Sequence, residues 1–100
     1  MNEKNVNKYI VSLLEFEIDI TKSSLKVFEY QIEVLNKQID LLKDIEPMPL
    51  FKKRYNEWTL KLRDLYLKLN DIYAKKIEEE EWLKTVNYLL KKATKYDISS

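Results

Sequence analysis

The chain has 100 residues, of which 45% are hydrophobic and 35% are charged, and its formal net charge is +1. It contains no cysteine, histidine or glycine. These absences exclude disulfides, thiolate nucleophiles, histidine-based acid–base pairs and thiolate or imidazole zinc sites within this chain. They also argue against phosphate-binding loops, which need glycine. We therefore expect a non-enzymatic protein with no cofactor and no bound metal.

The apolar residues are dispersed along the chain. The longest apolar runs hold two or three residues, as at Tyr9-Ile10-Val11, whereas a membrane-spanning helix needs about 20. The first residues, Met1 to Asn5, lack the positive start and apolar core of a signal peptide. We expect no membrane association and a cytoplasmic location.

Both prolines lie in the segment 46–50, Glu-Pro-Met-Pro-Leu, near the middle of the chain. Proline donates no backbone hydrogen bond and disfavours helix for the residue before it, so this segment ends one helix and can open the next. The sequence predicts one all-α domain over residues 1–100. It is a long, coiled-coil-like antiparallel helical hairpin with helices at 3–45 and 50–97 and a turn at 46–50.

The first helix, residues 3–45, carries a repeating apolar pattern. Apolar residues recur every three or four positions, the spacing of an a/d seam that packs against a partner helix. One set is Val11, Ile18, Leu25, Ile32 and Ile39, and the other is Leu14, Thr21, Phe28, Leu35 and Leu42. Because only Thr21 is polar among these residues, we expect the seam to form the core.

A second apolar stripe follows a neighbouring face of the same helix, and we call it the outer stripe. It comprises Tyr9, Leu13, Phe16, Ile20, Val27, Tyr30, Val34 and Leu41. A two-helix hairpin needs one seam only, and a large exposed apolar patch usually marks an interface. We predict that the outer stripe is a partner interface. Symmetric homo-oligomers are common, so we favour a homodimer that forms a four-helix bundle over a different protein partner.

The second helix, residues 50–97, carries a seam with one interruption. Its apolar positions are Phe51, Trp58, Leu65, Ile72, Val86 and Ala93, alternating with Tyr55, Leu62, Leu69, Leu83 and Leu90. Lys76 and Glu79 interrupt the pattern, which leaves open whether the helix is continuous through residues 75–81.

Folding the chain back at Met48 pairs residues whose numbers sum to about 97, which places Ile39 opposite Trp58. The interruption then faces Thr21 and Lys22, and we expect a polar layer that fixes the alignment, with Lys22 matched to residues 78–81. Residues 1–50 hold six lysines and nine acids, and residues 51–100 hold twelve basic residues and eight acids. We expect these opposite net charges to favour pairing of the two helices.

Four consecutive glutamates, Glu78 to Glu81, suggest a metal site at first sight. Consecutive helical residues point about 100° apart, so these carboxylates do not converge on one ion, and there is no histidine to complete a di-iron pattern. We interpret them as a solvated face.

Two basic clusters are further candidate sites. Lysines with one tyrosine share a face near the end of the second helix and resemble a nucleic-acid-binding pattern, although lysines there also favour the helix dipole. These residues are Lys84, Tyr88, Lys91, Lys92 and Lys95. At the turn, Lys52, Lys53 and Arg54 precede Tyr55 and Trp58. We expect the three cations to pair with Asp40, Asp44 and Glu46, with contact to an acidic partner at this tip as the alternative.

The heptads are generic and resemble no particular family. We expect a protein-interaction module that acts as an adaptor, scaffold or inhibitor. The alternative is a nucleic-acid-associated protein that uses the basic face at residues 84–95. Heavy use of Lys, Asn, Ile and Tyr is typical of AT-rich genomes, which fits a small protein of a virus or mobile element that blocks or bridges a host factor.

Overall fold

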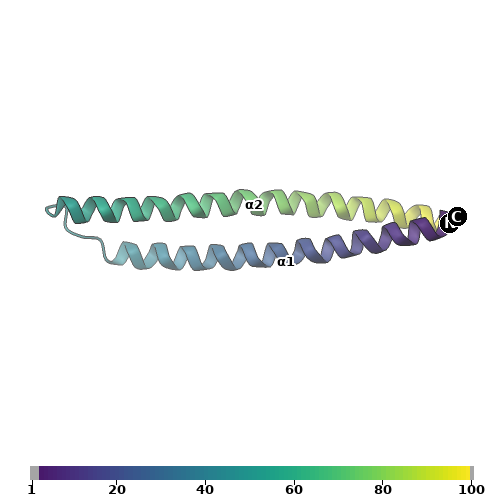
Figure 1. Ribbon diagram of the computed structural model, residues 1–100, viewed down its shortest axis with the longest axis horizontal. Coiled ribbons are helices and arrows are strands. Elements are labelled where there is room, and N and C mark those ends of the chain that lie inside the picture. The colour runs from purple at the N-terminus through teal and green to yellow at the C-terminus, as the bar shows by residue number, and fades with distance from the viewer. Residues whose placement is uncertain (1–2, 100) are drawn as a thin grey trace. The chain divides into compact units, whose positions relative to one another are not determined.

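The computed structural model describes the backbone of residues 3–99 and the side chains of residues 7–95. It holds two α-helices, α1 (Glu3–Asp44) and α2 (Lys52–Ser99), joined by residues 45–51 (Figure 1). Residues 3–99 contain no strand, so the predicted all-α helical hairpin is confirmed. The first helix begins at residue 3 as predicted, and the other three helix bounds differ from the predicted ones by one or two residues. α2 is continuous through residues 75–81.

The chain divides into two compact units, and each pairs part of α1 with part of α2. Unit 1 comprises residues 1–26 and 77–100, and unit 2 comprises residues 27–76. Unit 2 therefore contains the turn.

The turn follows from its hydrogen bonds and its prolines. The N–H of Ile45 donates to the carbonyl of Leu42 at 3.3 Å, a short-range bond that closes the end of α1. Pro47 has no N–H with which to continue the helix. The N–H of Phe51 then donates to the carbonyl of Met48 at 3.0 Å, which directs the chain into α2.

The predicted seams form the inner faces of the helices. All ten seam residues of α1 are buried or partly buried, as are all those of α2 except Phe51. Phe51 is exposed because it precedes the first residue of α2 and lies outside the helical repeat. Its ring instead lies 5.9 Å from the guanidinium carbon of Arg54.

The core of unit 2 shows that the predicted register is displaced by about one helical turn. Trp58 was predicted opposite Ile39, but its indole N–H donates to the carbonyl of Leu42 at 2.7 Å. Leu69 was predicted opposite Phe28, but its buried cluster holds three α1 residues nearer the turn, Ile32, Leu35 and Ile39. The prediction assumed a symmetric turn, whereas α2 begins beyond the end of α1 (Figure 1).

Unit 1 has a small core in which Ile18, Thr21 and Val86 are buried. Thr21 is only 1% exposed, and its hydroxyl donates to the carbonyl of Glu17, one turn earlier in the same helix, at 2.8 Å. This buried polar group is therefore satisfied within α1 and needs no partner on α2. The Trp82 indole N–H, in contrast, donates to the Glu17 carboxylate at 2.8 Å and joins the two helices of the unit.

The predicted polar layer is seen only in part. Lys76 and Glu79, at the interrupted seam positions, are partly buried. Lys22 is exposed, and none of the ion pairs found among residues 7–95 involves it. The predicted match between Lys22 and the acidic run is therefore wrong, because Lys22 lies outside the seam.

Three ion pairs each join residues four apart on one helix. They are Lys37 with Glu33 at 3.2 Å, Lys68 with Asp64 at 3.3 Å, and Lys75 with Asp71 at 3.1 Å. All three are exposed, where such pairs contribute only about 0.3–0.5 kcal/mol. None of these three pairs joins α1 to α2, so the opposite net charges of the two halves do not account for them.

Candidate functional site

The outer stripe is largely exposed. Seven of its eight residues, all except Val34, are between 44% and 67% exposed. Tyr9, Leu13, Phe16 and Ile20 belong to unit 1, and Val27, Tyr30, Val34 and Leu41 belong to unit 2. Hence α1 presents large apolar side chains that the hairpin seam does not use.

The exposed apolar face of α1 is wider than the sequence pattern indicated. Ile10 and Ile45 are also exposed, at 40% and 69%. Ile10 lies three residues before Leu13, so helical spacing places it beside the stripe, and Ile45 directly follows the last residue of α1. The three-residue spacing between Ile10 and Leu13 is visible in the sequence and would have identified Ile10 as part of this face.

Two grooves lie along the outer stripe in unit 2. The first, of about 440 Å³, is lined by Tyr30, Gln31, Val34, Leu35, Lys68, Asp71, Ile72 and Lys75. The second, of about 590 Å³, is lined by Gln38, Leu41, Leu42, Ile45, Lys61, Asp64, Leu65 and Lys68. Lys68 lines both grooves. Most of the other residues that line one groove lie seven positions along the chain from a residue that lines the other. The two grooves therefore continue one another along the same side of unit 2.

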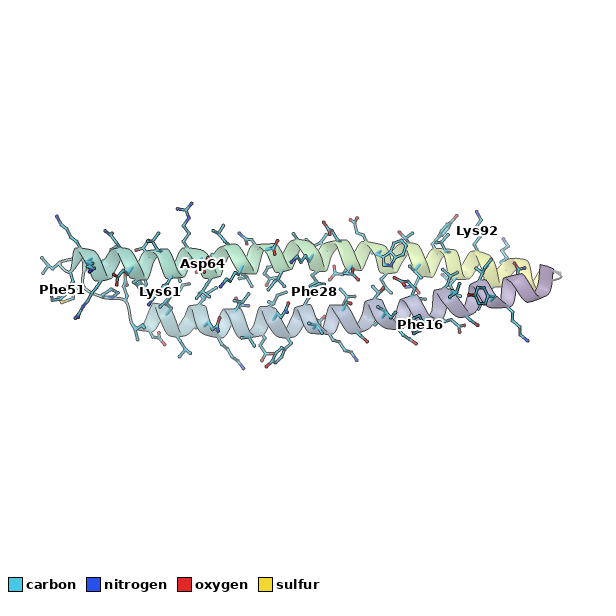
Figure 2. All side chains as sticks on the ribbon, in the orientation of Figure 1. Phe16, Phe28, Phe51, Lys61, Asp64 and Lys92 are labelled. Atoms are coloured by element: carbon cyan, nitrogen blue, oxygen red, sulfur yellow. The ribbon has the colours of Figure 1, made fainter. Side chains whose placement is uncertain are left out.

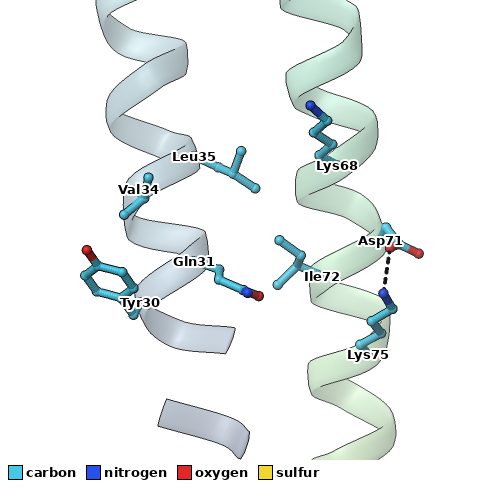
Figure 3. A pocket seen from close by; sticks show the side chains of 8 residues that line it. All are labelled: Tyr30, Gln31, Val34, Leu35, Lys68, Asp71, Ile72 and Lys75. Carbon is cyan, nitrogen blue, oxygen red and sulfur yellow. Dashed lines mark ion pairs between the residues drawn. The ribbon is translucent and has the colours of Figure 1, made fainter. Parts of the chain in front are cut away.

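The groove has two walls of different chemistry. On the α1 side it is lined chiefly by apolar residues, including Tyr30, Leu41 and Ile45. On the α2 side the rim consists of lysines and aspartates, with the Asp71–Lys75 ion pair marked by a dashed line in Figure 3. Leu35 and Ile72 point between the helices and form the floor, while Tyr30 points away from α2 (Figure 3). The sequence pattern predicted the apolar wall as an interface but not the charged one.

The predicted tip site is arranged differently from the expectation. Lys52, Lys53 and Arg54 are exposed, and none of them joins the ion pairs seen among residues 7–95. The predicted pairing with Asp40, Asp44 and Glu46 is therefore wrong. α2 begins beyond the end of α1 (Figure 1), whereas Asp40 and Asp44 belong to the last turns of α1.

Tyr55 and Trp58 pack against each other at the tip, and Trp58 also bonds to α1. Tyr55 and Trp58 are partly buried, with ring centroids 5.6 Å apart and planes tilted by 37°. Together with the indole hydrogen bond to the carbonyl of Leu42, this packing gives Trp58 a structural role at the end of α1.

Nearby, Tyr66 raises the pKa of Lys43, first by side-chain hydrogen bonding and then by charge. The Lys43 ammonium lies 5.7 Å from the Tyr66 ring centroid.

The charged candidates of unit 1 lie on its surface. Every member of the predicted nucleic-acid face, Lys84, Tyr88, Lys91, Lys92 and Lys95, is exposed. Of Glu78 to Glu81, only Glu79 is partly buried. Across the part of the chain that the structure describes, no three acidic side chains come together as a metal site.

Several exposed apolar residues of α2 were not singled out from the sequence. Leu60, Leu67 and Ile77 are each more than half exposed. In addition, neither helix within the described range is long and apolar enough to cross a membrane.

Comparisons with protein-family models, with curated proteins and with solved structures found no match to this chain.

Proposed function

We propose that this chain is a non-enzymatic protein-interaction module that presents the exposed apolar face of α1 to another protein molecule. The observation that carries this proposal is the exposure of seven of the eight outer-stripe residues. Adaptor, scaffold and inhibitor are the forms of this function that a small helical surface fits. A composition rich in Lys, Asn, Ile and Tyr is typical of AT-rich genomes, which fits a small protein of a virus or mobile element.

The hairpin leaves the apolar side chains of the outer stripe largely uncovered, and their burial would be favourable. Full burial of a large apolar side chain is worth about 1.5–3 kcal/mol. Seven residues that are each about half exposed still hold a large part of that energy, which association can use against its entropic cost. A solvated helix face has no comparable need for large apolar residues.

Photocrosslinking tests the proposal at single positions. A photoreactive phenylalanine analogue replaces Phe16 in the outer stripe or, as a control, Lys22, which is exposed and lies six residues further along α1, about 120° around the helix from Phe16. We expect protein adducts from position 16 and few from position 22. Equal yields at both positions, or no adduct from either, would contradict the proposal.

A second candidate function is nucleic-acid association, which is favoured by the exposure of all five residues of the basic face. Lysines that neutralise phosphates release counterions, so such binding weakens steeply as salt rises. Titration of single- and double-stranded DNA and RNA at several salt concentrations tests it. Absence of binding at low salt would eliminate this function.

A further inference from the structure

The charged rim of the groove in unit 2 has a regular order. On α2, six exposed charged residues alternate in sign and are spaced by four and three positions, which places them on one face of the helix. In chain order they are Glu57, Lys61, Asp64, Lys68, Asp71 and Lys75. The last five line the groove.

A row of alternating charges with an even number of members is complementary to itself when reversed. If a second copy lies antiparallel to the first, with the midpoint between Asp64 and Lys68, every pair across the contact has opposite signs. The pairs are Glu57 with Lys75, Lys61 with Asp71, and Asp64 with Lys68. Parallel pairing in register would instead bring like charges together.

The apolar wall, formed by residues of α1 and by Ile45 just after the end of α1, obeys the same symmetry. Tyr30, Val34, Leu41 and Ile45 are centred between residues 37 and 38. Antiparallel pairing about this centre places Tyr30 against Ile45 and Val34 against Leu41. Apolar side chains thus meet apolar side chains, while charges meet opposite charges.

A single two-fold axis must cross α1 and α2 at the same level along the hairpin. The residues that line the groove on the two helices show which positions lie at one level. The α1 residues that line the groove are centred at 37.5 and the α2 residues at 68. The charge row is centred at 66, which lies two residues, or about 3 Å of helix, from that level. The apolar and charged patterns are therefore compatible with one axis perpendicular to the helices.

We propose that the groove face of unit 2 is covered by the same face of a second copy of this chain, with α1 antiparallel to α1 and α2 antiparallel to α2. The inference rests on the proposed function and names the partner for the unit 2 part of that surface. A two-fold axis parallel to the helices would set the apolar wall of one copy on the charged row of the other. Apolar side chains would then face charged ones, and neither the apolar contacts nor the opposite-charge pairs would form.

The size of the face suits a dimer. Residues 57–75 of α2 extend over about 27 Å, and two helix diameters give a width of about 20 Å. Accessible area exceeds this projected area, so each copy contributes an area on the order of the 800 Å² per partner of a standard interface.

Complementary charge variants test the pairing directly. In one, Lys61→Glu, Lys68→Glu and Lys75→Glu make the row entirely acidic; in the other, Glu57→Lys, Asp64→Lys and Asp71→Lys make it entirely basic. Sedimentation equilibrium should give twice the 12.2 kDa chain mass for the unchanged protein. Each variant alone should be monomeric, and the equimolar mixture should recover the dimer.

A matched control changes the same amount of charge away from the groove. Lys52→Glu, Lys53→Glu and Arg63→Glu alter three exposed residues that line neither groove, and this variant should remain a dimer. Circular dichroism checks that all variants stay helical. A mixture of the acidic and basic variants that stays monomeric overturns the proposal, as does a control variant that dissociates equally.

A cysteine variant keeps the proposal testable if the charge variants fail to fold. The chain has no cysteine, so Gln38→Cys, next to the predicted axis, should give a disulfide-linked dimer on mild oxidation, and Asp40→Cys should not. Equal linkage at both positions overturns the second-copy proposal. A monomeric unchanged protein that still gives adducts at position 16 would overturn only this inference, and loss of those adducts as well would overturn the proposed function.

Discussion

Two neighbouring positions of α1 separate the hairpin core from the proposed interface. Ile39 is 3% exposed and Leu41 is 67% exposed. Ile39→Ala removes part of the unit 2 core, and large-to-small substitutions of this kind cost about 2–5 kcal/mol. We expect this loss of unfolding free energy at every protein concentration.

The effect of Leu41→Ala depends on what covers the side chain. In an isolated hairpin the side chain lies mostly in water, and its truncation should change stability by no more than about 0.5 kcal/mol. Full burial of leucine is worth about 1.5–3 kcal/mol, and about two-thirds of its surface is still available for burial. If a second copy covers Leu41, each copy should lose about 1–2 kcal/mol.

Thermal unfolding followed by circular dichroism at about 2 and 200 µM distinguishes these cases, because dimer stability depends on protein concentration. We expect the Tm of the unchanged protein to rise with concentration and Leu41→Ala to lower it mainly at the higher concentration. Ile39→Ala should lower it at both. An equally small effect of Leu41→Ala at the two concentrations would show that no second copy covers Leu41.

Three further predictions concern other parts of the chain. Trp58→Phe keeps most of the packing but removes the indole hydrogen bond to the carbonyl of Leu42, and should cost about 0.5–1.5 kcal/mol in urea unfolding; no loss would show that the bond is not stabilising. Thr21→Val should leave stability unchanged or raise it, because the buried hydroxyl bonds only within its own helix; a loss above about 2 kcal/mol would indicate an essential polar contact. If nucleic acid binds, neutralising Lys91 and Lys95 should reduce the slope of affinity against salt by about 2, and an unchanged slope would place binding elsewhere.

The fold was predictable because few alternatives satisfy the sequence. The heptad spacing from Val11 to Leu42 allows little besides a long helix with one inner face, and those seam residues are buried or partly buried. Pro47 and Pro49 located the turn to within two residues of the observed helix ends. Burial of apolar side chains at period 3.5 is a strong and local signal.

The register and the tip were not predictable from the same signal. A seam with Leu or Ile at most positions packs almost equally well when it is shifted by one turn, and the geometry of residues 45–51 decides the shift. Because α2 begins beyond the end of α1, Arg54 lies near Phe51 rather than pairing with the acids of α1. The charge order along α2 was readable in the sequence. Its meaning depends on the finding that Lys61 and Asp64, which are labelled on α2 in Figure 2, line one groove with the apolar residues Leu41 and Ile45.

Hydroxyl-radical footprinting of the unchanged protein at low and high concentration tests directly whether a second copy covers the outer stripe of unit 2. Tyr30 and Leu41 on the outer stripe are each 67% exposed, and Tyr73 and Ile77, which helical spacing places on the side of α2 away from the charged row, are 42% and 56% exposed. The second pair is therefore an internal control. We expect Tyr30 and Leu41 to become protected as the concentration rises while Tyr73 and Ile77 stay reactive. If all four residues keep the same reactivity at both concentrations, no second copy covers the outer stripe of unit 2.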